Sequence, residues 1–307
     1  MRFIFILLCL FPFCLAAAEP ENVSAPSYLL VEMDSFQIMA GKDYHKRLPP
    51  ASTTKVMTTL LALEKLQGSE SVIPTKDVIA ISASKMNLVP SRPYKSLDLM
   101  TGAMVESAND AAYALAVHIA GTENSFSAMM NQKAHSLGAI DTNFINASGL
   151  PADDQYTTCY DLALIFKEAL LNPKFRQLIG TQYFEFEDAK RRVKYKNHNR
   201  LLFCFQPSIG GKTGYTRKAR HTYAGAFEKD GKVYILTMLG SHNLWNDSVE
   251  ILKTLYDRVP TTEEIRLARS NAVSLTSHRV VKKVKKPLLK KKTVRKKIRI
   301  RAKRTHT

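Results

Sequence analysis

The sequence is poor in cysteine and lacks the ligand patterns that hold metal ions. Only four cysteines occur among 307 residues, none in a CxxC pair, and the eight histidines include no HExxH or comparable pairing. These absences exclude the usual zinc motifs, so we expect neither a metal nor another cofactor. Two of the cysteines, Cys159 and Cys204, lie beyond the first 18 residues, and the sequence leaves open whether they form a disulfide.

The sequence also lacks an apolar run of the roughly 20 residues that a membrane-spanning helix needs. A shorter run follows Met1 and Arg2 and ends in three alanines at 16–18. A basic start, an apolar middle and a small-residue end are typical of a secretory signal peptide, so we expect residues 1–18 to be removed. Cys14 would suit a lipid-attachment site, but the Phe-Pro-Phe in front of it lacks the small residues of such a site.

Acidic residues are absent after Glu264, where 17 of the 45 lysines and arginines lie. Residues 1–264 hold 28 basic and 27 acidic side chains, so the net charge of +18 belongs almost wholly to the C-terminal end. We therefore expect a folded domain at 25–258 and a disordered basic tail at 265–307. On an exported protein this tail would meet anionic lipid or wall polymer rather than a specific nucleic acid, or would serve only to keep the chain soluble.

Hydrophobic periodicity predicts an α+β fold. An extended segment at 28–34 has a hairpin partner at 37–40, and Asp230-Gly231 joins two further strands near the end of the folded part. Helical spacing begins at Ser52 and recurs at about 109–121, 126–137, 161–171 and 248–256. A strand pair, a helical block, a hairpin and a closing helix indicate a sandwich of one sheet with helices.

Three short motifs follow one another along the chain. They are STTK at 52–55, SAN at 107–109 and KTG at 212–214. Each alone is common enough to be a helix cap or a flexible turn. Their order, and their placement at a helix start, before a helix and at a hairpin strand, together indicate nucleophilic catalysis.

The first motif predicts a nucleophile and its base. Residues three apart share a helix face, so the Lys55 amine can lie beside the Ser52 hydroxyl. A serine hydroxyl is too weak an acid to attack an amide unaided, but an amine whose pKa is lowered by burial and positive neighbours can accept its proton. The helix N-terminus adds positive potential and the backbone N–H of Ser52 for the oxyanion. We therefore predict Ser52 as nucleophile and Lys55 as general base.

The other two motifs predict proton transfer and substrate binding. Ser107 is placed to relay a proton to the leaving amine, and Asn109 to hold the substrate amide. Lys212 and Thr213 would bind the terminal carboxylate of an extended peptide that pairs with the strand. The backbone N–H of Tyr215 would be the second oxyanion donor.

These motifs resemble the serine DD-carboxypeptidases of the low-molecular-mass penicillin-binding protein family. The resemblance extends to KRLPPASTTK at 46–55, ESANDAA at 106–112, ASGL at 147–150 and NRLL at 199–202. It implies a sandwich of an antiparallel sheet flanked by helices, with a helical subdomain, and a bacterial enzyme of the periplasm or cell envelope. It also implies that peptidoglycan stem peptides ending in D-Ala-D-Ala acylate Ser52 and release D-alanine, and that β-lactams acylate the same serine.

Other interpretations share some of these features. A class A β-lactamase needs a deacylating glutamate in an ExxLN loop, and EALLN at 168–172 fits that pattern. However, Glu168 is expected inside a helix, and Ala108 stands where those enzymes typically carry aspartate. Endopeptidases and transpeptidases use the same three motifs, so the choice of carboxypeptidase rests on the resemblance. An inactive binding protein is disfavoured because all three motifs are intact.

Overall fold

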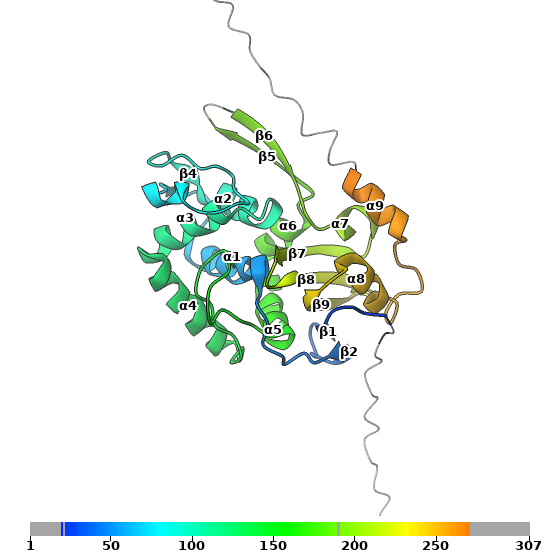
Figure 1. Cartoon of the computed structure of the whole chain (residues 1–307). Helices are drawn as coiled ribbons and strands as arrows, with labels where there is room; N and C mark the ends of the chain where they lie inside the picture. Colours follow the sequence, from blue (N-terminus) through cyan, green and yellow to red (C-terminus); the bar gives the residue numbers. More distant parts are fainter. Residues whose placement is uncertain (1–19, 21, 189–190, 271–307) are drawn as a thin grey trace, which may run out of the picture. The chain divides into compact units, whose positions relative to one another are not determined.

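Five antiparallel strands form the sheet on which the structure is built (Figure 1). The computed structural model describes residues 20, 22–188 and 191–270. The strand order is β2-β1-β9-β8-β7, so β7 lies at one edge of the sheet. The bounds are β1 Ser27–Glu32, β2 Ile38–Lys42, β7 Ser208–Thr216, β8 Arg220–Lys229 and β9 Lys232–Ser241.

Both faces of this sheet are covered. Side chains alternate along a strand, and in β1 Leu29 and Val31 join the larger core while Tyr28 and Leu30 join the smaller one. The smaller core is closed by three helices, which are α7 Leu201–Cys204, α8 Leu244–Leu252 and α9 Thr262–Ser270. The larger core connects the sheet to a block of helices. This arrangement is the predicted α+β sandwich.

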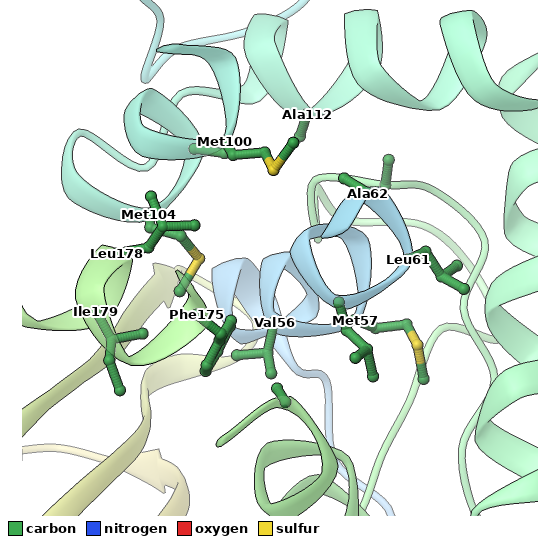
Figure 2. Close-up of a cluster of buried hydrophobic side chains, with 14 of the residues drawn as sticks. Val56, Met57, Leu61, Ala62, Met100, Met104, Ala112, Phe175, Leu178 and Ile179 are labelled. Carbon is green, nitrogen blue, oxygen red and sulfur yellow. The ribbon is translucent and has the colours of Figure 1, made fainter. Parts of the chain in front are cut away.

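The helical block is organised around the helix that follows Ser52. This helix, α1, buries Val56, Met57, Leu61 and Ala62, and Figure 2 shows them beside apolar side chains of α2, α3 and α6. Because apolar neighbours surround it, the start of α1 is held rigidly. The bounds are α1 Lys55–Lys65, α2 Ser96–Val105, α3 Asn109–Ala120, α4 Glu123–Ser136, α5 Cys159–Leu170 and α6 Pro173–Gly180.

Short elements complete the described part of the chain. Two small antiparallel hairpins pair β3 with β4 and β5 with β6. The β5–β6 hairpin projects from the helical block above the sheet (Figure 1). The bounds are β3 Ser71–Val72, β4 Tyr94–Lys95, β5 Tyr183–Asp188 and β6 Arg191–Lys196, with 3₁₀ turns η1 Ala51–Thr54 and η2 Lys76–Ile79.

The C-terminal boundary differs from the expectation. The helix α9 covers the first residues of the predicted tail, and Ile265 and Ala268 are buried in it. Ordered structure therefore continues through Ser270, because an apolar face follows the last acidic residues. The rest of the predicted tail, 271–307, and the predicted signal peptide, 1–18, lie outside the described residues. Within the described ranges, no helix is both long and apolar enough to cross a bilayer.

Candidate active site

The turn that carries Ser52 is fixed from two sides. Ser52 lies in the 3₁₀ turn η1, one residue after Ala51, whose φ of 48° is in the left-handed region. The carbonyl oxygen of Pro50 accepts hydrogen bonds from the hydroxyls of Thr53 at 2.7 Å and Thr222 at 2.8 Å. Because Thr222 belongs to β8, the sheet holds the turn and presents Ser52 at the junction of sheet and helices.

Lys55 lies beneath Ser52 and is fully buried. Its Nζ is 3.0 Å from the Ser52 Oγ and donates to the Asn109 Oδ1 and the Ser148 carbonyl oxygen, each at 2.6 Å. Burial holds the pKa of Lys55 well below its ordinary value, and the nearby positive charge of Lys212 lowers it further. A lysine with a lowered pKa, in contact with a serine hydroxyl, has the geometry of a base for that serine.

Lys212 forms a second buried amine on the other side of the site. Its Nζ donates to the Ser107 Oγ at 3.0 Å and to the Thr213 carbonyl oxygen at 2.7 Å. Burial lowers the pKa of Lys212 to about 7, while the charge of Glu106 acts in the opposite direction. The three sequence motifs thus meet in space. The amine of Lys212 lies below the surface of the cleft, and its predicted contact with a substrate carboxylate stays a prediction.

Asn109 connects Lys55 to a loop at the edge of the cleft. Its Oδ1 accepts from Lys55, and its Nδ2 donates to the carbonyl oxygens of Ser82 and Ala83, each at 3.0 Å. The neighbouring Asp110 accepts from backbone N–H groups further along the same loop. In this structure, the Asn109 amide is therefore occupied in positioning the base and the loop. Its predicted contact with the substrate amide stays a prediction.

A cleft of about 430 Å³ opens above these residues. Ser52, Ser107, Asn109, Thr213 and Tyr215, all predicted from the sequence, line it. Tyr215 is 56% exposed, so it stands at the rim. Four further lining residues, Gly149, Leu150, Arg200 and Gly214, lie in the motifs quoted above without having been assigned a role. The sequence did not point to the rest of the lining, which consists of Ala83, Ser84, His198, Thr216, His221, Leu244 and Trp245.

Glycine allows the nucleophile turn to approach β7. A Cβ placed on Gly214 would lie 2.7 Å from the backbone nitrogen of Ser52 and would overlap the Thr222 hydroxyl. The missing side chain therefore brings the Ser52 N–H next to the strand segment that carries Tyr215. An oxyanion hole requires two backbone N–H groups directed at the substrate carbonyl oxygen, and the predicted role of the Tyr215 N–H as the second of them stays a prediction.

Comparison with known proteins agrees with this site. Residues 15–243 match the peptidase S11 family, described as D-alanyl-D-alanine carboxypeptidase. The chain belongs to that family. It is a hydrolase of the serine carboxypeptidase type that functions in cell-wall metabolism, and the predicted family, fold class and enzyme class are confirmed.

Individual S11 relatives show how far the similarity extends. The chain is 33% identical to the D-alanyl-D-alanine carboxypeptidase DacB2 of Mycobacterium tuberculosis. The alignment covers 76% of this chain and 81% of the relative. A D-alanyl-D-alanine carboxypeptidase structure from the same organism superposes with a TM-score of 0.74 at 30% identity, covering 80% of this chain and 96% of that one. The S96A mutant of the Streptomyces K15 DD-transpeptidase gives 0.71 at 27% identity, covering 76% and 97%.

Three further findings bear on the other expectations from the sequence. Glu168, the candidate β-lactamase glutamate, lies in α5, is paired with Lys133 at 3.3 Å and does not line the cleft. Cys159 and Cys204 are both free thiols, and burial raises the pKa of each. Among the described residues, no cluster of potential metal ligands occurs.

Proposed function

We propose that this S11 carboxypeptidase cleaves the terminal D-alanine from peptidoglycan stem peptides through an acyl-enzyme on Ser52. The observation that supports this most directly is the Lys55 Nζ at 3.0 Å from the Ser52 Oγ, with the amine fully buried and its pKa lowered. Because its lowered pKa favours the unprotonated form, this amine can take the proton as the Ser52 oxygen attacks the carbonyl carbon of the penultimate residue.

The remaining steps follow from the same groups. The backbone N–H groups of Ser52 and Tyr215 would stabilise the oxyanion. The Ser107 hydroxyl, fixed by Lys212, would pass its proton to the leaving nitrogen as the carbon–nitrogen bond breaks and D-alanine departs. Ser107 would regain a proton from Lys55, which returns Lys55 to its unprotonated form. Water would then attack the ester, again with Lys55 as base, and restore the serine. A β-lactam would form the same ester with Ser52.

The direct test is incubation of the mature protein with a peptide ending in D-Ala-D-Ala and, separately, with fluorescent penicillin. We expect release of free D-alanine and a covalent penicillin adduct that peptide mapping places on Ser52. When an amine is added to the peptide reaction, a product in which the amine replaces the terminal D-alanine, formed without the hydrolysed peptide, would favour a transpeptidase. Rapid penicillin turnover without D-alanine release would favour a β-lactamase.

The pH dependence of acylation should be bell-shaped. Lys55 must lose its proton to act as base, so the rate should rise with pH through its lowered pKa. The rate should fall again around pH 7, where Lys212 loses the positive charge that it holds against the Ser107 Oγ, the group that passes the proton to the leaving nitrogen. Stopped-flow acylation by fluorescent penicillin measures this profile. Lys212→Met should move the rising limb to higher pH, whereas a profile without a falling limb in the unmodified protein would contradict the assignment.

We place the enzyme in the periplasm or cell envelope, with the basic C-terminal end directed to anionic lipid or wall polymer. The proposal is supported by 17 basic and no acidic residues after Glu264 and by the signal-like first 18 residues. Deletion of residues 271–307 should leave D-alanine release unchanged and abolish salt-sensitive binding to phosphatidylglycerol vesicles. Equal binding of both forms in a sedimentation assay would rule out this role of the tail.

A further inference from the structure

One wall of the cleft is formed by a loop that contains neither helix nor strand. The loop spans residues 82–89 between η2 and β4, and its Ala83 and Ser84 line the cleft. Because backbone groups in a loop lack the partners that a helix or sheet provides, the shape of this loop depends on hydrogen bonds from other segments. Side chains of α3 and of the β5–β6 hairpin provide such bonds.

The start of α3 holds the loop at two places. The Asn109 Nδ2 donates to the carbonyl oxygens of residues 82 and 83, as described above. Further along, the backbone N–H groups of Met86 and Leu88 donate to the two carboxylate oxygens of Asp110 at 2.9 and 3.0 Å. Asp110 is only 1% exposed, so these bonds are shielded from water.

Arg191, the first residue of β6, holds carbonyl groups of the same segment. Its guanidinium group donates to the carbonyl oxygen of Met86 and, at 3.0 Å, to that of Asn87. Met86 is thus held at its N–H by Asp110 and at its carbonyl by Arg191. The loop is therefore fixed between α3 and the hairpin.

The hairpin is a firm support for this contact (Figure 1). Phe186 of β5 is buried, and its ring centre lies 5.9 Å from that of Tyr94 in β4. The carboxylate of Asp188, with a side chain only 6% exposed, pairs with Arg191 at 3.3 Å and with Arg92 at 3.4 Å. The guanidinium group that holds the loop is itself held in place by the hairpin.

The Asn109 side chain connects this loop to the predicted base. Its Oδ1 accepts from the Lys55 Nζ at 2.6 Å, while its Nδ2 donates to the loop carbonyls. The two ends of a carboxamide are not interchangeable, because the oxygen only accepts and the NH₂ group only donates. Loop carbonyls at fixed positions therefore keep the oxygen directed at Lys55, and a loop that moved away would let the amide rotate.

We propose that Arg191 is a positioning residue for the acylation of Ser52. By fixing the loop at residues 86 and 87, it keeps the Asn109 amide oriented and the Lys55 amine in place. The inference rests on the proposed acylation of Ser52 and deepens it. Arg191 does not line the cleft, so it acts through the loop and Asn109 and not through contact with a substrate.

The first measurement is the rate constant of Ser52 acylation by fluorescent penicillin in Arg191→Met. It should fall roughly tenfold to a hundredfold, as expected when a catalytic group is displaced by up to about 1 Å. Arg191→Lys, which can reach only one of the two carbonyl oxygens, should lose less, and it replaces the Met variant if that variant does not fold. Thermal unfolding of each variant shows whether the fold is retained.

A double-mutant cycle with Asn109→Ala separates positioning from a general loss of structure. If Arg191 acts through Asn109, adding Arg191→Met to Asn109→Ala should slow acylation by less than about twofold further, because the side chain that transmits the effect is already absent. Two independent losses would multiply instead.

Arg192→Met is the matched control. Arg192 follows Arg191 on β6, its side chain is 69% exposed, and it pairs with Glu185 of the same hairpin at 2.7 Å. This variant removes the same charge and should acylate like the unmodified protein. An unchanged rate in Arg191→Met, an equal loss in Arg192→Met, or losses that multiply in the double variant would overturn the inference while leaving the proposed function intact. An unmodified protein that forms no penicillin adduct and releases no D-alanine would instead overturn the proposed function, and this inference with it.

Discussion

Replacing Lys55 with methionine should lower the rate of Ser52 acylation by roughly 10⁴-fold. Methionine is close to lysine in length and suits a buried site, so the packing of α1 is expected to survive. What is lost is the amine 3.0 Å from the Ser52 Oγ and its two contacts with Asn109 and the Ser148 carbonyl. Acylation by fluorescent penicillin, followed over hours, measures the effect.

Lys65→Met is the control for this substitution. Lys65 ends the same helix and is exposed, so its removal changes the charge of α1 without touching the site. It should leave acylation unchanged. If Lys55→Met keeps its thermal transition and still acylates at a rate near that of the unmodified protein, then Lys55 is not the base, and another group must accept the Ser52 proton.

The catalytic centre was readable from the sequence because its residues lie in short motifs with local geometry. Three residues of helical spacing bring Lys55 to Ser52, so the nucleophile and base could be placed without knowledge of the fold. The strands β8 and β9 and the Asp230-Gly231 turn between them were likewise visible from alternation and a turn signal. The meeting of Ser107 with Lys212 needed the family resemblance, because 105 positions separate them.

The walls of the cleft were not readable in the same way. The wall residues come from three separate segments: His198 and Arg200 from the turn before α7, His221 from β8 and Trp245 from α8. Their residue types and spacing alone do not mark them as binding residues. Arg200 lay within a block matched by resemblance, but the direction of its side chain depends on Trp245 at the start of α8. Tertiary packing, not spacing, brings these groups together.

Some helices and strands of the structure were not predicted from the sequence, and α2 and β5 show two different causes. The helix α2 is buried on nearly every side, so its apolar residues show no 3.6-residue stripe that could be told from a buried strand. Gly102 weakens the helix signal further, because glycine is a poor helix former. The structure needs glycine at this position, since a Cβ there would overlap the Met86 side chain. In β5, by contrast, Phe184 and Phe186 alternate with exposed glutamates, so a strand signal is present in the sequence. The helix that was expected at 248–256, packed on the sheet, is α8, and it lies at Leu244–Leu252.

Gly149 connects the wall of the cleft to the nucleophile turn, and replacing it with alanine should have the second large effect. Its φ of 80° is in the left-handed region, which by itself costs an alanine about 1–2 kcal/mol. In addition, a Cβ there would overlap the carbonyl oxygen of Ala51, the residue before Ser52. Since the preceding Ser148 carbonyl also accepts from Lys55, a shift of this segment displaces both nucleophile and base.

Gly121→Ala is the control that separates the backbone strain from the steric overlap. It has a φ of 79°, and a Cβ there would meet nothing within 4 Å, so Gly121→Ala carries the backbone strain without the overlap. Both variants should lose similar stability from φ alone. Only Gly149→Ala should acylate roughly a hundredfold or more slowly, because a displacement of about 1 Å at a reacting group has an effect of that order. Equal acylation rates in the two variants would show that the turn carrying Ser52 tolerates movement, which its anchoring to Thr222 of the sheet argues against.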